Sequence, residues 1–125
     1  MGNPADPARQ AAGESHAEDY FVSSDDGSRH TIFPGVEIQT MAGQQIMLSL
    51  VRFEPDSVVL DHAHPHEQVG MLLSGKLEFT VDGITRILRQ GDKWRIPGGV
   101  IHRVRAVDGP ATALDVFNPV REDYL

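Results

Sequence analysis

Three histidines fall within seven residues of this chain, where positions 62–68 read HAHPHEQ. A further histidine, His102, follows 40 positions after the first of them. Neutral imidazole is the commonest protein ligand for transition metals, so the clustering indicates a metal site. Residues two apart in an extended strand share a face, and His62 and His64 are therefore expected to point the same way.

A turn after His64 would bring one more ligand to the same place. Proline cannot continue a central strand, so Pro65 predicts a turn, and Gln68 can then return to the site at the start of the next strand. The predicted metal ligands are His62, His64, Gln68 and His102. They suit one divalent transition metal (Ni, Zn, Fe, Mn or Co), with positions left open for water or substrate. The alternative is an exposed polar loop and, at position 102, a hydrogen-bonded core histidine.

The other histidines and the acid beside them are not expected to bind the metal. The turn should point His66 and Glu67 away from the site, where they lie on the surface or orient a ligand imidazole. His16 and His30 sit among polar residues and are expected to be solvated.

A second group of candidate residues lies in the last strand. Ala113, Asp115 and Phe117 alternate with apolar residues, so they share one face. A carboxylate in an apolar strand is unfavourable unless it is paired, bound to a metal or catalytic. Arg121 is the candidate partner, either in a structural ion pair with Asp115 or as the anchor of a carboxylate substrate.

Short apolar segments separated by turns must position these residues. Asp82-Gly83 is a strong hairpin signal, and Phe79 and Trp94 are expected to be core aromatics. Turns every eight to twelve residues predict an all-β antiparallel sandwich or barrel. The expected strands are 36–40, 45–53, 58–62, 68–73, 76–81, 84–88, 93–96, 100–107 and 111–117.

Composition limits the classes of function. The chain has 125 residues, enough for one domain, and its net charge of −7 argues against an extended nucleic-acid surface. No cysteine is present, so disulfides and thiolate metal sites are excluded. No apolar run is long enough for a membrane span, and a cytoplasmic protein is expected. Residues 1–19 are expected to form a disordered or arm-like tail, and 20–125 the folded domain.

Two motifs of the chain resemble those of the cupin superfamily. Its first motif, G-x5-H-x-H-x3,4-E-x6-G, is matched by His62, His64, Gln68 and Gly75, and its second, G-x5-P-x-G-x2-H-x3-N, by Gly91, Pro97, Gly99 and His102. Three positions differ: Asp56 replaces the first glycine, Gln68 the glutamate and Ala106 the asparagine. The resemblance covers about residues 36–117. It implies a single-domain jelly-roll β-barrel (a double-stranded β-helix) of the half-bicupin type that forms a homodimer.

The tail DVFNPVREDYL and the stretch HPHEQxGxxLxG are similar to those of the KdgF-like cupins of uronate metabolism. This resemblance implies a metal-dependent isomerase or tautomerase that converts unsaturated uronates, small carboxylate substrates, to linear ketonised sugars. It assigns the catalytic roles to Asp115, Arg121 and Phe117. The departure at Gln68 makes the fourth ligand neutral, which should weaken binding of hard cations and leave the metal more Lewis-acidic.

Two other functions stay open. Cupins of the quercetinase type use nearly the same ligands for dioxygenase chemistry on aromatic or diketone substrates, and a non-catalytic barrel that binds a small molecule is a third reading. The charges of Asp115 and Arg121 favour a polar, anionic substrate.

Overall fold

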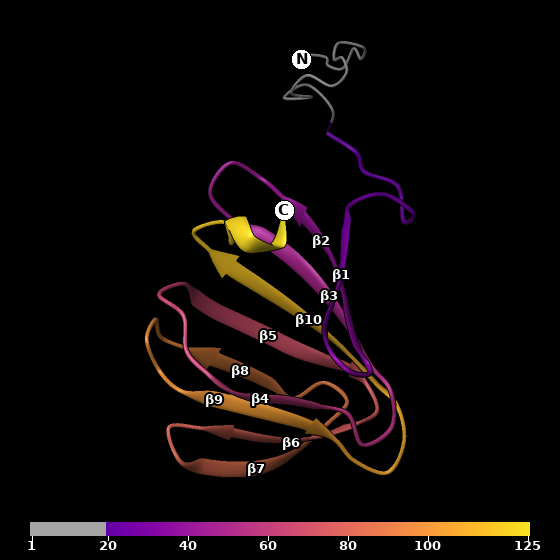
Figure 1. Ribbon diagram of the computed structural model, residues 1–125, viewed down its shortest axis with the longest axis vertical. Coiled ribbons are helices and arrows are strands. Elements are labelled where there is room, and N and C mark those ends of the chain that lie inside the picture. The colour runs from indigo at the N-terminus through magenta and orange to yellow at the C-terminus, as the bar shows by residue number, and fades with distance from the viewer. Residues whose placement is uncertain (1–19) are drawn as a thin grey trace.

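The computed structural model describes residues 20–125, which form two antiparallel β-sheets that face each other (Figure 1). The larger sheet has the strand order β1-β2-β3-β10-β5-β8, and the smaller one the order β4-β9-β6-β7. The strands are β1 (Ser28–Phe33), β2 (Val36–Ala42), β3 (Met47–Phe53), β4 (Val58–His62), β5 (Glu67–Ser74), β6 (Lys76–Val81), β7 (Ile84–Arg89), β8 (Lys93–Ile96), β9 (His102–Ala106) and β10 (Ala111–Asn118). The predicted tail, including His16, lies outside these residues.

The chain crosses repeatedly between the two sheets. The connections β3–β4, β4–β5, β5–β6, β7–β8, β8–β9 and β9–β10 each change sheet. This is jelly-roll topology, and it confirms the predicted all-β fold class. Strand β10 lies in the middle of the larger sheet, between β3 and β5. Well-separated segments of residues 20–125 therefore surround the inner face of β10.

The core lies between the sheets. Alternate residues of β10 are buried, which places Asp115 and Phe117 on the inner face as predicted. The largest fully buried side chains include Ile38, Leu72 and Leu77. Burying such a side chain contributes roughly 1.5–3 kcal/mol, so this core is the main support of the site.

Strand β1 was not expected from the sequence. Its residues, SRHTIF, pair with β2 at the edge of the larger sheet, and none of them is fully buried. An edge strand with little buried surface carries little apolar alternation. The prediction for His30 is wrong as well: His30 is half-buried, and its Nε2 donates to the Tyr124 carbonyl oxygen at 3.1 Å.

The replacement of the first motif glycine has a backbone explanation. Asp56 has φ of 63°, in the left-handed region where glycine is the usual residue. Aspartate tolerates this region better than most side chains because its short polar group bonds locally. The turn before β4 therefore keeps its shape without the glycine.

The C-terminal segment returns over the open end of the sandwich. After the cis Asn118-Pro119 bond it forms the short 3-10 helix η2 (Glu122–Tyr124) beside β1 and β2 (Figure 1). Thr40 Oγ1 donates to the Tyr124 carbonyl oxygen at 2.7 Å, which fixes η2 to β2. Within residues 20–125 no helix has the length and apolarity needed to cross a bilayer.

Candidate active site

The structure brings three of the predicted ligands together. His62 ends β4 and is the direct cross-strand partner of His102 at the start of β9, while His64 follows in the loop after β4. One ring nitrogen from each of these three lies within 4.8 Å of the others. The His62 and His102 ring centroids are 4.2 Å apart. This group could hold a metal ion.

Backbone carbonyl groups fix the tautomer of each imidazole. In all three rings Nδ1 lies 2.9–3.1 Å from a carbonyl oxygen two residues away. The pairs are His62 with Leu60, His64 with His66, and His102 with Val100. A carbonyl can only accept, so Nδ1 carries the proton and the Nε2 lone pair of each neutral ring is left for a ligand.

Two of these nitrogens have surroundings that suit a cation. His102 Nε2 is buried and makes no hydrogen bond within the described part of the chain. His64 Nε2 faces Gln68 Oε1 at 3.0 Å, so two acceptors oppose each other. Burial, helped by the charges of Arg121 and His102, lowers the pKa of His64 to about 4, which keeps the ring neutral. These donors fit a divalent transition metal, and Gln68 remains the predicted fourth ligand.

The predicted acid, Asp115, is buried beside this group. Trp94 Nε1 donates to Asp115 Oδ1 at 2.7 Å. Burial raises the pKa of Asp115 to about 6, against the hydrogen bonds from Gln68 and Trp94 and the charge of Arg121. Asp115 can therefore exchange a proton near neutral pH.

Gln68 connects the acid to the histidines through the two ends of one amide. Its Oε1 faces His64, and its amide also hydrogen-bonds to the Asp115 carboxyl group. A carboxylate can only accept, so the glutamate of the cupin motif could not donate to an ionised Asp115. This hydrogen bond explains why position 68 holds a glutamine and not the glutamate of the cupin motif.

The suggested ion pair between Asp115 and Arg121 does not form. Arg121 is buried, and its Nη2 instead donates to Asp123 Oδ2 at 2.9 Å. Its guanidinium carbon lies 3.9 Å from the centroid of the Tyr124 ring and 5.1 Å from that of Phe117. Two aromatic rings and one carboxylate thus hold the guanidinium in place.

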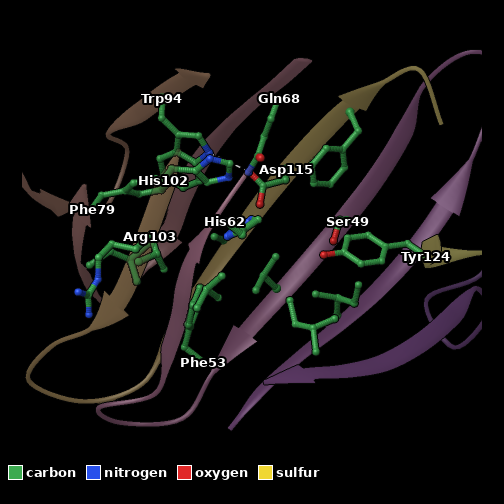
Figure 2. Close-up of a pocket in the computed structure, with 18 of the residues that line it drawn as sticks. Ser49, Phe53, His62, Gln68, Phe79, Trp94, His102, Arg103, Asp115 and Tyr124 are labelled. Atoms are coloured by element: carbon green, nitrogen blue, oxygen red, sulfur yellow. Dashed lines mark hydrogen bonds between the residues drawn. The ribbon is translucent and has the colours of Figure 1, made fainter. Parts of the chain in front are cut away.

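Residues of both groups line one cavity between the sheets. Figure 2 shows His62, His102 and Gln68 around Asp115, with Trp94 and Phe79 to one side and Ser49 and Tyr124 to the other. Arg121 and Phe117 line the same cavity. Its remaining lining is mostly apolar and includes Val51, Phe53, Val59, Leu77 and Val104. The cavity therefore combines a cluster of polar side chains with an apolar wall. This lining suits a small substrate with one charged end.

Some residues play parts that the sequence did not suggest, whereas Phe79, His66 and Glu67 lie as expected. Trp94 was expected to be only a core aromatic, but its indole N–H binds Asp115; Phe79 is buried as predicted. His66 contributes its carbonyl oxygen to His64, and Glu67 is exposed. Tyr124 lines the cavity from the C-terminal segment, and its only sequence signal was its place in the tail motif.

Comparison with known proteins finds relatives that agree with the cupin resemblance of the sequence. The family described as "Cupin domain" matches residues 49–117. The pectin degradation protein KdgF of Dickeya dadantii is 28% identical over 81 residues, which cover 64% of this chain and 74% of that protein. The structure of KdgF from Halomonas sp. has a TM-score of 0.77 at 26% identity, covering 84% of this chain and 97% of that one. An RmlC-like cupin from Shewanella frigidimarina has a TM-score of 0.78 at 26% identity, covering 86% and 96%.

Proposed function

Because this chain belongs to the cupin domain family, we propose that it is a metal-dependent isomerase or tautomerase that converts unsaturated uronates to linear ketonised sugar acids. One observation carries the proposal: three imidazole Nε2 lone pairs converge, and two of these rings, His62 and His102, line one cavity with the protonatable carboxyl group of Asp115. Arg121 faces the same cavity and can receive a substrate carboxylate. The similarity to KdgF proteins, one of them named for pectin degradation, supports this substrate class.

The reaction requires one proton to move from oxygen to carbon. The anomeric hydroxyl loses its proton, the bond from C1 to the ring oxygen breaks, and C1 becomes a carbonyl group. The ring oxygen becomes the ketone oxygen at C5, and C4 gains a proton. The reaction is therefore an isomerisation with no net gain or loss of atoms. His62, His64, His102 and Gln68 would hold a divalent metal, which would supply Lewis acidity at the ring or anomeric oxygen.

The chain's own residues bind the substrate and move the proton. Asp115 takes the anomeric proton and returns it to C4, a role that its pKa of about 6 supports. Arg121 binds the carboxylate at C6, and Phe117 packs under the guanidinium and shapes the pocket. The burial of this arginine strengthens its attraction for an anion.

A substrate assay tests the proposal. Purified protein with its metal content measured should speed the loss of the ultraviolet absorbance of the conjugated C4=C5 carboxylate, well above the spontaneous rate. A rate equal to the spontaneous one would contradict it. A protein that binds the uronate without turnover would support the reading as a non-catalytic binding cupin.

The apolar wall of the cavity favours one other function. Val51, Phe53 and Phe79 could contact the ring of an aromatic substrate, as a quercetinase-like dioxygenase requires. Oxygen uptake by the Fe(II)-loaded protein with such a substrate would support this alternative, whereas uronate conversion without oxygen supports the isomerase. The homodimer and the cytoplasmic location belong to the proposal too, and light scattering on the purified protein tests the first.

A further inference from the structure

A row of polar or small residues crosses the inner face of the larger sheet. The cross-strand pairs run from Thr40 to Ser49, Asp115, Gly70 and Trp94, across β2, β3, β10, β5 and β8. The next row, from Ile38 through Val51 and Ala113 to Leu72, is wholly apolar and buried. The polar row is therefore a local exception in an apolar face.

The hydrogen bond from Trp94 to Asp115 passes over a whole strand. Trp94 lies on β8 and Asp115 on β10, and both pair with Gly70 on β5 between them. Two strand spacings separate their backbones, roughly 9.6 Å. A side chain as long as tryptophan can cover this span, and the Phe79 ring, 4.8 Å from the Trp94 ring, packs against it.

Gly70 leaves the space through which this bond passes. A Cβ atom at position 70 would overlap both Trp94 Nε1 and Asp115 Oδ1. Gly70 is not one of the glycines with positive φ, so its backbone conformation alone does not require glycine. The indole and the carboxyl group occupy the space that a side chain at position 70 would need, which explains why this residue is a glycine.

We propose that Trp94 is a positioning residue for the isomerisation: its indole N–H, passing over Gly70, fixes the orientation of the Asp115 carboxyl group. Oδ1 is held by the indole, so the second oxygen keeps a set direction relative to the substrate. This inference rests on the proposed function, because it concerns the proton that Asp115 moves. An error of about 1 Å in such a group can lower the rate on the order of 100-fold.

Two substitutions at Trp94 separate positioning from packing. Trp94→Phe keeps a ring against Phe79 but removes the N–H donor, and kcat should fall about 10- to 100-fold. KM and the metal content should stay within about twofold of the parent. Trp94→Gln places an N–H group at a similar reach and should recover part of kcat. An unchanged kcat in Trp94→Phe, or no recovery in Trp94→Gln beyond Trp94→Phe, would overturn the inference.

A pair of glycine substitutions tests whether the hydrogen bond from Trp94 to Asp115 needs the space above Gly70. Gly70→Ala should lower kcat at least as much as Trp94→Phe because the new methyl group occupies the path of the bond. Gly43→Ala is the matched control, since its Cβ would make only ordinary contacts at 3.5 Å and beyond. Full activity in Gly70→Ala would contradict the proposed passage.

A spectroscopic measurement separates this inference from the proposed function. The chain has a single tryptophan, so its indole N–H gives one proton resonance. Asp115→Ala should move that resonance upfield and speed its exchange with solvent; an unmoved resonance would overturn the inference while leaving the uronate activity standing. A parent protein without uronate turnover would instead overturn both.

Discussion

At the scale of single residues, backbone carbonyls and neighbouring side chains hold the groups around the cavity in defined protonation states. Three backbone carbonyls place the imidazole protons on Nδ1, so the Nε2 atoms converge as lone pairs. Gln68 presents an oxygen to His64 and an amide hydrogen bond to Asp115. The candidate metal site and the candidate proton carrier thus share one amide group.

This shared amide predicts the effect of restoring the glutamate of the cupin motif. Gln68→Glu adds a charged oxygen beside the histidines, so metal affinity should rise at least severalfold. The carboxylate cannot donate to Asp115 and repels its charge, so kcat should fall about tenfold or more. Titration with metal and steady-state kinetics measure the two effects, with the exposed Gln45→Glu as control. A variant with tighter metal binding and unchanged kcat would show that the amide contact to Asp115 is dispensable.

The histidines could be found from the sequence and Trp94 could not, for a physical reason. His62 and His64 are two residues apart, so strand geometry alone places them on one face. The bond from Trp94 to Asp115 depends on the register of three strands, β8, β5 and β10. A side chain that reaches across an intervening strand leaves no local pattern in the sequence. The sequence therefore indicated only that Trp94 is a core aromatic.

At the scale of elements, the C-terminal segment positions Arg121 and Tyr124 at the cavity. Thr40 and His30 both donate to the Tyr124 carbonyl oxygen and tie η2 to the edge of the larger sheet. The sequence predicted most strands because each ends at a glycine, proline or aspartate turn. It did not predict β1, whose half-exposed residues depend on pairing with β2, nor the return of the tail over the site.

The ion pair within this segment predicts a pH dependence. Burial acts to raise the pKa of Asp123, but the hydrogen bond and charge of Arg121 outweigh it and lower that pKa, and the charge of His66 acts in the same direction. A lowered pKa means that the pair stabilises the fold above the usual pKa of 3.8 and that this is lost as the pH falls through the folded value. Asp123→Asn should therefore be less stable at about pH 7, by less than about 1 kcal/mol because Asp123 is half exposed, and equal to the parent near pH 2.

Urea unfolding at both pH values measures this difference, with Asp25→Asn in an exposed loop as the control. An equal deficit of Asp123→Asn at both pH values would show that the side chain acts through packing and not through its charge.

At the scale of the whole molecule, the site lies where the two sheets meet. His62 and His102 belong to the smaller sheet, whereas Gln68 and Asp115 belong to the larger one. The jelly-roll connections bring together residues that are 40 or more positions apart. The resemblance to cupins predicted the jelly-roll fold, whereas the facing pairs and the lining of the cavity come only from the structure.

A metal bound by ligands from both sheets should also stabilise the fold. A ligand at 100 times its Kd contributes about 2.7 kcal/mol, which corresponds to a rise in Tm on the order of 10 °C for a chain of this size. Calorimetry before and after chelation measures the shift, and His102→Ala should show little response to added metal. Equal Tm values with and without metal in the parent would contradict the prediction that ligands from both sheets bind one metal.

In the proposed mechanism Asp115 delivers a proton to C4 of an unsaturated uronate. The most direct test runs the conversion in D2O and locates the deuterium in the product by NMR. We expect the parent protein to place deuterium at one of the two C4 positions, whereas Asp115→Asn, with its metal content unchanged, should give only the spontaneous rate and label both. Equal labelling of both positions by the parent, or full activity in Asp115→Asn, would contradict the role of Asp115.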